Sequence, residues 1–370
     1  MDRAPFRIID GGNYKICDYS CMEPLGAFVG RMSRRFKVAL CGYYGFGNLG
    51  DELLAEALIK LLEEEGISKE EMVLLSSLPG VSERKFAVKS VKRDNLIALW
   101  NILKQTESLL LGGGGLFQDV TSFRSCFYYW GVVRIAELAG CKIWAFGNSI
   151  GPLRRSISKY LTADAYKKCN FIAVRDQKAL KWIEGRGLKG CLAPDPVLYL
   201  WEDSTPSCLE VRNHILVNFR PWGGALERRG AEAVERFARK KKLNITGVAL
   251  SEEDVDCMNC LSKEGVIDIK EIKTVTTLEE AIGVMKCGRA AVGMRLHFCV
   301  LSLMAGLAPT AIPYDPKVRE FAKEWGLPVW EPENVLKVVP RESDTIGNKL
   351  AVAKKEIKTA MKRAVNEIIR

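Results

Sequence analysis

Short apolar runs alternate with amphipathic, helix-like segments along this chain from Phe36 onward. That alternation is typical of βαβ units, which build parallel sheets, and it predicts an α/β fold. The strands expected in the first half are Lys37–Cys41, Met72–Ser76, Ser108–Leu111, Lys142–Phe146 and Phe171–Val174. Those expected in the second half are His214–Asn218, Ile245–Leu250, Val266–Ile269, Ala290–Val292 and Pro309–Ile312. The main expected helices are Glu52–Glu65, Leu226–Lys241, Thr277–Cys287 and Leu296–Ala305.

A length of 370 residues suits two such units. The polar stretch 202–207 interrupts the pattern and marks a boundary. We therefore expect two Rossmann-like domains facing a cleft, an architecture similar to that of GT-B glycosyltransferases. The predicted organisation is an irregular lead-in (1–35), an N-terminal Rossmann-like domain on the acceptor side (36–203), a linker (204–212), a C-terminal Rossmann-like domain on the donor side (213–335) and a basic helical tail (336–370).

Composition narrows the class of protein. Apolar residues make up 48% and charged residues 27% of the chain, the balance of a globular protein. The 12 cysteines are dispersed, and the one CxxC, Cys257–Cys260, lacks a second pair to complete a zinc site. We expect a cytoplasmic protein without metal. The formal charge of +10 suits an anionic substrate or membrane surface, and no nucleic-acid module is visible, so we expect no nucleic-acid partner.

The segment Gly45–Gly50 matches G-x-G-x-x-G between an expected strand and helix. A nicotinamide site also needs an acid at the end of the second strand, about 20 residues later. That strand ends in Ser76 and Ser77, which argues against nicotinamide. The glycines and the helix N-terminus still favour an oxygen-rich or anionic ligand.

Two glycine loops are candidate sugar sites. Tyr43, Tyr44 and Phe46 lie within the first loop, and aromatic faces are good platforms for sugar rings. Alternatively, these rings cover the sheet edge, while Asn48 and Asp51 cap the helix. The second run, Gly112–Gly115 with Gly113 and Gly114 at its centre, is expected to form a tight turn after its strand. Asp119 beyond it either accepts sugar hydroxyls, acts as a base or caps the next helix.

Eight motifs occur in a fixed order, and together they resemble those of the polysaccharide pyruvyl transferase family. The resemblance spans roughly residues 36–325. The motifs are Gly42–Glu52, Leu111–Asp119, Gly147–Pro152, Ala173–Asp176, Asp195–Leu198, Asn218–Trp222, Gly293–His297 and Tyr314–Val318. The lead-in departs from the family pattern. Asn148 and Ser149 also depart, standing where the family carries Gln and a small residue.

The resemblance implies a transferase that moves pyruvyl from phosphoenolpyruvate to a sugar diol, closing a cyclic ketal on a cell-wall glycan precursor, lipid-linked in some cases. Phosphoenolpyruvate is a co-substrate, and no cofactor is implied. A group titrating near neutrality is the natural acid for this reaction, which favours His297. The implied catalytic residues are His297 and Arg295. The implied donor-binding residues are Arg175, Arg220, Arg295 and Lys317. The implied acceptor-binding residues are Tyr44, Phe46, Asn48, Asp51, Gly113, Gly114 and Asp119.

Two alternatives remain open. A nucleotide-sugar glycosyltransferase of GT-B type would share the architecture, with Asp315 gripping ribose hydroxyls. A non-catalytic glycan-binding module would use the glycine loops for packing alone. The other histidine, His214, opens a strand and is expected to be structural.

The C-terminal segment 351–370 places apolar residues at helical spacing among many basic ones. The apolar stripe comprises Ile357, Met361, Ala364, Val365 and Ile368. Such a helix either lies on an anionic membrane or packs back onto the first domain. With the net charge, it predicts a cytoplasmic enzyme that associates loosely with the inner face of the membrane.

Overall fold

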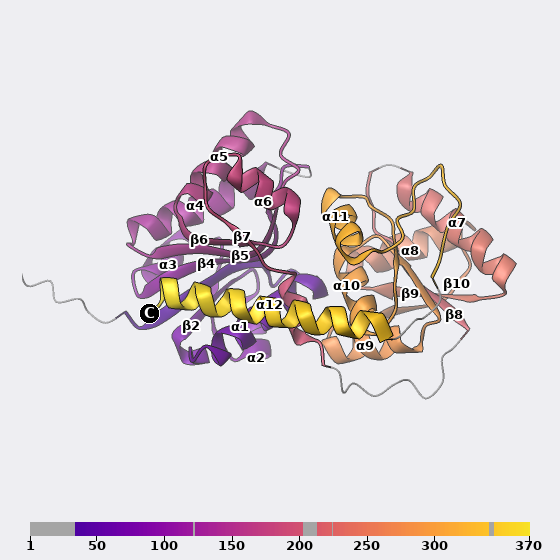
Figure 1. Cartoon of the computed structure of the whole chain (residues 1–370), viewed down its shortest axis with the longest axis horizontal. Coiled ribbons are helices and arrows are strands. Elements are labelled where there is room, and N and C mark those ends of the chain that lie inside the picture. The colour runs from indigo at the N-terminus through magenta and orange to yellow at the C-terminus, as the bar shows by residue number, and fades with distance from the viewer. Residues whose placement is uncertain (1–33, 121–122, 203–212, 224, 340–343) are drawn as a thin grey trace, which may run out of the picture. The chain divides into compact units, whose positions relative to one another are not determined.

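The computed structural model describes residues 34–120, 123–202, 213–223, 225–339 and 344–370 (Figure 1). Residues 35–370 form one compact unit. Nearly all of the predicted lead-in and the whole predicted linker lie outside the described residues. Among the described residues, no helix is long and apolar enough to cross a membrane.

The first sheet has seven parallel strands in the order β3-β2-β1-β4-β5-β6-β7. Its strands are β1 Phe36–Tyr44, β2 Met72–Ser76, β3 Lys89–Lys92, β4 Thr106–Phe117, β5 Lys142–Ile150, β6 Cys169–Val174 and β7 Cys191–Leu192. The connecting helices are α1 Leu49–Glu64, η2 Lys69–Glu71, α2 Pro79–Phe86, α3 Leu96–Leu103, α4 Arg124–Leu138, α5 Ser156–Lys167, α6 Gln177–Glu184 and η3 Pro196–Leu200.

The second sheet has five parallel strands in the order β10-β9-β8-β11-β12. Its strands are β8 His214–Asn218, β9 Asn244–Ala249, β10 Ile269–Thr274, β11 Ala290–Gly293 and β12 Thr310–Ala311. The helices of this half are α7 Leu226–Lys241, α8 Glu252–Lys263, α9 Leu278–Cys287, α10 Leu296–Met304 and α11 Pro316–Trp325, followed by α12 Asp344–Ile368. Two parallel sheets with alternating helices confirm the predicted fold class.

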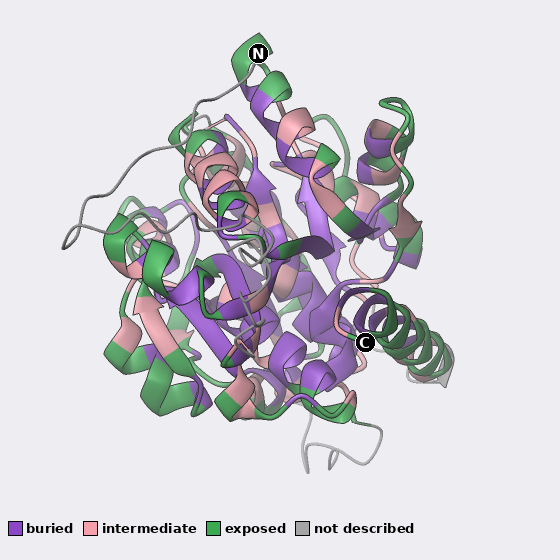
Figure 2. Ribbon diagram, turned by 90° about the vertical axis from the view of Figure 1, so that its left-hand side faces the viewer, coloured by how far each residue is buried: buried purple, intermediate pink, exposed green. Residues whose placement is uncertain are grey.

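The central strands are buried because helices cover both faces of each sheet, which is why they read as nearly continuous apolar runs (Figure 2). In the first sheet, α1 packs on one face, and α3, α4 and α5 pack on the other. This arrangement places the carboxyl ends of the strands, and the helix N-termini that follow them, along one edge.

Three local expectations need correction. The run Gly112–Gly115 does not turn: β4 continues through it to Phe117, with Gly113 and Gly114 at positive φ. The strand expected at Val266–Ile269 instead starts at Ile269, as β10. Val266 and Ile267 are buried, but they belong to the segment before the strand. The pattern also missed β3, whose sequence Lys-Ser-Val-Lys is too polar to read as a strand, and the two-residue β7.

The C-terminal helix α12 is packed against the rest of the protein. Its whole apolar stripe, from Ile357 to Ile368, is at most 2% exposed and joins the largest apolar cluster. Lys142 Nζ donates to the Ile368 carbonyl (2.7 Å), which fixes the end of the helix to β5. The stripe is therefore unavailable to a membrane, and the packed-helix alternative holds.

Candidate active site

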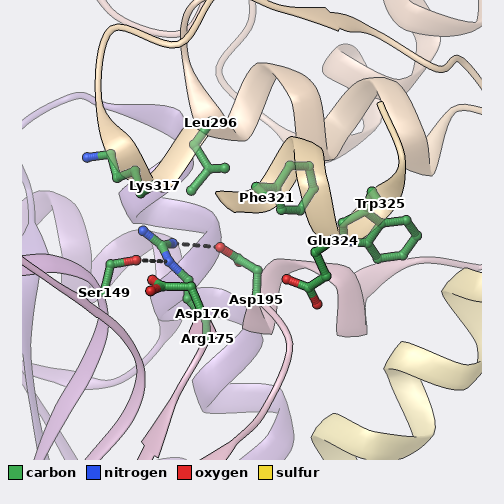
Figure 3. Close-up of a pocket in the computed structure, with 9 residues that line it drawn as sticks. All are labelled: Ser149, Arg175, Asp176, Asp195, Leu296, Lys317, Phe321, Glu324 and Trp325. Atoms are coloured by element: carbon green, nitrogen blue, oxygen red, sulfur yellow. Dashed lines mark hydrogen bonds and ion pairs between the residues drawn. The ribbon is translucent and has the colours of Figure 1, made fainter. Parts of the chain in front are cut away.

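The carboxyl edges of the two sheets contribute to one pocket. The backbone N–H of Leu49, at the start of α1, donates to the carbonyl of Leu250, just past β9 (2.9 Å). Figure 3 shows the pocket and the side chains that line it. It is lined by Ser149, Arg175, Asp176, Asp195, Leu296, Lys317, Phe321, Glu324 and Trp325. The lining side chains leave free space for about one water molecule, so a ligand enters only if they move apart.

Arg175 follows β6 directly and is held by two neighbours. Its Nη1 forms a buried ion pair with Asp195 Oδ2 (2.6 Å), and its Nε donates to Ser149 Oγ (2.7 Å) (Figure 3). Ser149 is one of the two departures from the family pattern, so this departure adds a hydrogen bond that orients the guanidinium.

Arg295 stands just past β11 and is also held by a buried carboxylate. Its Nε lies 2.7 Å from both oxygens of Asp254, and its Nη2 donates to Ser251 Oγ (2.6 Å). Asp254 is fully buried and also accepts from Asn218 Nδ2 (3.0 Å). Arg295 is therefore a structural ion-pair partner as well as a candidate ligand for substrate.

His297 occupies the first turn of α10 and packs against the N-terminus of α1. A β-carbon added to Gly50 would lie 2.0 Å from His297 Nδ1, so only glycine fits there. His297 Nε2 is buried with no hydrogen-bond partner in the part of the chain that the structure describes, and it lies 3.8 Å from Asp195 Oδ2.

Burial lowers the pKa of His297 to about 4. Asp195 opposes this shift, while the cations Arg175, Lys317 and Arg295 reinforce it. The expectation that His297 titrates near neutrality in the substrate-free protein is thus wrong, because an imidazolium here would be desolvated beside three cations.

Asp51 lies in the first turn of α1, among the same cations. Asn48 caps this helix by accepting from Gly50 N–H (3.2 Å), and its Nδ2 donates to Asp51 Oδ2 (2.5 Å). A β-carbon on Gly114 would lie 3.4 Å from Asp51 Oδ1, so Asp51 and Gly114 face one another. Burial raises the pKa of Asp51 to about 6, although Lys317, Arg295 and Arg175 oppose the shift.

Lys317 and Arg220 are held more loosely than the other two cations. Lys317 Nζ lies 3.8 Å from Asp315 Oδ2, and a β-carbon on Gly115 would lie 3.6 Å from it. Arg220 Nη1 donates to Tyr314 OH (3.2 Å), and its Nη2 lies 3.8 Å from Glu253. Arg220 Nε has no partner among the described residues. Both cations retain donors for an anionic ligand.

The aromatic loop presents a different pair of rings than expected. Tyr43 and Phe46 are exposed and stack on one another, with centroids 4.0 Å apart at an interplanar angle of 8°. Tyr44 is only 1% exposed, and its hydroxyl donates to the Gly112 carbonyl (2.5 Å). Tyr44 is therefore a packing residue, and Tyr43 takes its place as a candidate platform.

Three further candidates do not line the pocket. Asp119 accepts from the backbone N–H groups of Arg154 (2.7 Å) and Arg155 (2.8 Å), so its carboxylate fixes the start of α5. Asp315 accepts from Lys317 N–H (3.0 Å) and caps α11, which leaves it poorly placed to grip a ribose. Gly113 packs beneath Leu54 of α1.

Sequence reasoning missed the carboxylates that orient the arginines. Asp195 belongs to a family motif, but its pairing with Arg175 was not foreseen. Asp254 lies in the acidic first turn of α8 and resembles an ordinary helix-start residue. Among the described residues, no group of three or more His, Cys, Asp or Glu side chains is arranged to hold a metal.

The sequence pattern of the polysaccharide pyruvyl transferase family matches residues 48–316, well over half of the chain. This chain belongs to that family. A search among curated proteins gives no significant match. All eight motifs on which the resemblance rests lie wholly or partly within the matched range.

Solved structures show how widely the family's fold is shared. A UDP-GlcNAc 2-epimerase from Methanocaldococcus jannaschii is similar at a TM-score of 0.55 and 8% identity, over 90% of this chain and 99% of that one. The Neisseria meningitidis epimerase bound to UDP-GlcNAc gives 0.54 and 10%, over 89% and 99%. A glycosyltransferase from Rickettsia africae gives 0.52 and 12%, over 90% and 94%. At such low identity these likenesses establish a GT-B-like fold and nothing about activity.

Proposed function

We propose that this protein transfers the pyruvyl group of phosphoenolpyruvate to two hydroxyls of a sugar, forming a cyclic ketal and releasing phosphate. The observation that carries the proposal is one cluster in which Arg175, Arg295 and Lys317 surround His297 and Asp51 at the N-termini of α1 and α10. Family membership supports the reaction class, and the cluster supports the choice of an anionic donor.

The cluster suits a small polyanion for two reasons. Helix N-termini carry partial positive charge and unpaired N–H groups, and α10 has no side-chain cap in this structure. Cations supply the remaining charge, and two of them, Lys317 and Arg220, keep donors available. Phosphoenolpyruvate has a phosphate and a carboxylate on three carbons, so it can engage several of these groups at once.

In the proposed mechanism, His297 gives a proton to the methylene carbon of phosphoenolpyruvate, leaving a cationic carbon at C2. A sugar hydroxyl adds to C2 and passes its proton to Asp51. A second hydroxyl then displaces phosphate and closes the ketal. The proton of the second hydroxyl returns to His297, and Asp51 passes the proton of the first hydroxyl to the departing phosphate, so both groups regain their starting states.

The low pKa of His297 makes this proton transfer depend on the substrate. A bound phosphate and carboxylate place negative charge beside the imidazole, which raises its pKa. His297 is therefore neutral in the substrate-free protein at neutral pH and takes up a proton as the donor binds. Asp51 has a pKa near 6, which suits a base that works close to neutrality.

On the acceptor side, we propose that the exposed faces of Tyr43 and Phe46 stack against the sugar. Burial raises the pKa of Tyr43, and the carboxylates of Asp51 and Glu253 raise it further, which shows that this ring lies within electrostatic reach of the cluster. In this proposal the acceptor is a cell-wall glycan precursor, and the proposal extends to precursors that are linked to a lipid.

The decisive experiment measures phosphate release from phosphoenolpyruvate with a panel of glycans carrying 1,2- or 1,3-diols, and it identifies the ketal by NMR. The control replaces phosphoenolpyruvate by nucleotide sugars. We expect phosphate release that depends on the acceptor. Sugar transfer from a nucleotide sugar without phosphate release from phosphoenolpyruvate would overturn the proposal in favour of a glycosyltransferase.

A further inference from the structure

A second surface on the first sheet combines large exposed apolar side chains with basic ones. The N-terminal ends of α4 and α5 expose four large apolar side chains: Phe123 is 41%, Phe127 56%, Ile157 50% and Tyr160 65% exposed. Four exposed cations accompany them, Arg124, Arg154, Arg155 and Lys159. We call these eight residues the basic aromatic ridge. A clustered set of exposed apolar side chains of this size marks an interaction surface.

Contacts between the two helices make the ridge continuous. Trp130 Nε1 of α4 donates to Asp164 Oδ2 of α5 (2.8 Å). One turn toward the N-termini, Phe127 contacts the Trp130 ring with centroids 5.8 Å apart, and Tyr160 precedes Asp164 by four residues. Figure 1 shows α4 and α5 side by side on the same face of the sheet.

The entry to α5 is fixed to the same place. The Arg155 guanidinium lies 5.7 Å from the centroid of the Phe123 ring, at the start of α4. The Asp119 carboxylate, just past β4, holds the backbone of Arg154 and Arg155. The ridge is therefore a formed surface with its cations at its N-terminal end.

Apart from Asp119, which accepts from the backbone of Arg154 and Arg155, acidic residues are scarce near the ridge in the sequence. Segments 120–136 and 150–163 contain no Asp or Glu. Arg154, Arg155 and Lys159 form no ion pair with any described residue. The ligand that complements this surface must combine negative charge with an apolar layer beneath it.

We propose that the basic aromatic ridge docks the protein on an anionic bilayer. Aromatic side chains favour the boundary between headgroups and acyl chains, and Arg and Lys favour anionic headgroups. A second copy of the chain is a poor occupant, because a two-fold interface would set four cations against the same four.

Docking here has a consequence for the site. The N-termini of α4 and α5 follow β4 and β5, so the ridge lies on the same sheet edge as Gly114 and Ser149. A glycan carried on a membrane lipid would thus be presented next to the acceptor side. This consequence rests on the proposed function, but the docking itself does not.

The test is co-sedimentation of the full chain with vesicles of phosphatidylcholine alone or mixed with phosphatidylglycerol. We expect binding only to the mixed vesicles, with release at high salt. Phe127→Ser with Tyr160→Ser should weaken binding about tenfold or more, because both apolar contacts are lost. Arg155→Glu with Lys159→Glu should weaken it by at least about tenfold and flatten the salt dependence.

Matched controls lie on the same and on another helix. Leu138→Ser alters an even more exposed apolar residue at the far end of α4, and Lys355→Glu with Lys362→Glu alters the basic face of α12. Both should bind as the parent protein does. Phosphate release with a water-soluble acceptor should be unchanged in every ridge variant, so failure of docking and failure of the proposed reaction are distinguishable.

Several outcomes would overturn the proposal. Unchanged vesicle binding in both ridge variants would remove the ridge from membrane contact, as would parent protein that stays in solution at low salt. A lower Tm in the ridge variants would show that another part of the chain covers the surface. A change in oligomeric state without vesicles would indicate a second copy, and tight salt-sensitive binding to an oligonucleotide would indicate nucleic acid.

Discussion

The two halves of the site each hold one arginine with a buried aspartate, yet they differ in what else they bring. The first half pairs Arg175 with Asp195 and adds Asp51, an acid that forms no ion pair with any described residue. The second half pairs Arg295 with Asp254 and adds two loosely held cations, Lys317 and Arg220. The difference separates cations that shape the site from cations that are available to a ligand.

The largest expected effect concerns the arginines that are paired with buried aspartates. Replacing Arg295 by Met leaves the carboxylate of Asp254 buried without its cationic partner. Breaking a buried pair in this way costs about 3–5 kcal/mol, so the free energy of unfolding should fall by that amount in urea titrations. Lys317→Met, at a partly exposed position, should leave the unfolding free energy nearly unchanged. An equal free energy of unfolding for the two variants would contradict the distinction between cations that are paired with a buried aspartate and cations that are available to a ligand.

Next in size is the loss of the proton donor. His297→Asn should lower kcat by about 10²-fold or more, with Tm retained. The parent protein should also take up protons when phosphoenolpyruvate binds near neutral pH, because the bound anion raises the pKa of His297 from about 4. Calorimetry in buffers of different ionisation enthalpy measures that uptake. Uptake that persists at full size in the variant would assign the proton to another group.

A third test concerns the loosely held cations that are available to a ligand. Lys317→Met removes a charge-assisted contact worth about 1.5–3 kcal/mol, so KM for phosphoenolpyruvate should rise roughly 10- to 100-fold. The matched control is Lys323→Met, which removes an exposed charge from the same helix. An equal rise in the KM for phosphoenolpyruvate in both variants would contradict this prediction.

A smaller effect concerns Asp51 and pH. Its folded-state pKa of about 6 exceeds the ordinary 3.8, so its contribution to stability is full below about pH 4 and is lost as pH rises through 6. Asp51→Asn should therefore be more stable than the parent at pH 7, by about 1 kcal/mol after allowance for partial solvent access, while losing turnover. Thermal unfolding at pH 4 and pH 7 measures the difference. A variant destabilised at both values would make Asp51 a structural residue.

The smallest expected effect is at the aromatic loop. Tyr43→Ala or Phe46→Ala should raise the acceptor KM a few-fold, since ring stacking contributes about 0.5–1.5 kcal/mol, and should leave the donor KM alone. Tyr44→Ala is the contrast, because it should lower Tm through lost packing. If both substrates suffer equally in the Tyr43 and Phe46 variants, the rings are packing residues.

The buried strands were predictable because both faces are apolar, and that pattern is visible in the sequence. The edge strand β3 was not, since only packing identifies a polar strand. The glycine run within β4 was read as a turn because glycine permits one, whereas pairing of Gly112 and Gly114 with β5 keeps it in the strand.

Within the site, sequence reasoning placed the basic residues at strand ends but missed their partners. Asp254 precedes Arg295 by 41 residues, and only the fold brings them together. The pKa of His297 was also out of reach, because it depends on burial against α1 and on three cations drawn from both halves. Composition reveals which groups are present, whereas their charge state follows from three-dimensional surroundings.

Helix α12 acts mechanically as a strap. It packs against α1, β5, β6 and η3 of the first half and against α10 of the second. Near its middle Lys354 Nζ donates to the Trp201 carbonyl (2.7 Å), and just past its end the Arg370 side chain donates to the Glu65 carbonyl (2.7 Å). A wide hinge-like swing of one sheet away from the other would have to bend this helix or peel it off. We therefore expect substrates to enter and products to leave through movements of the loops at the sheet edges, with the strap intact.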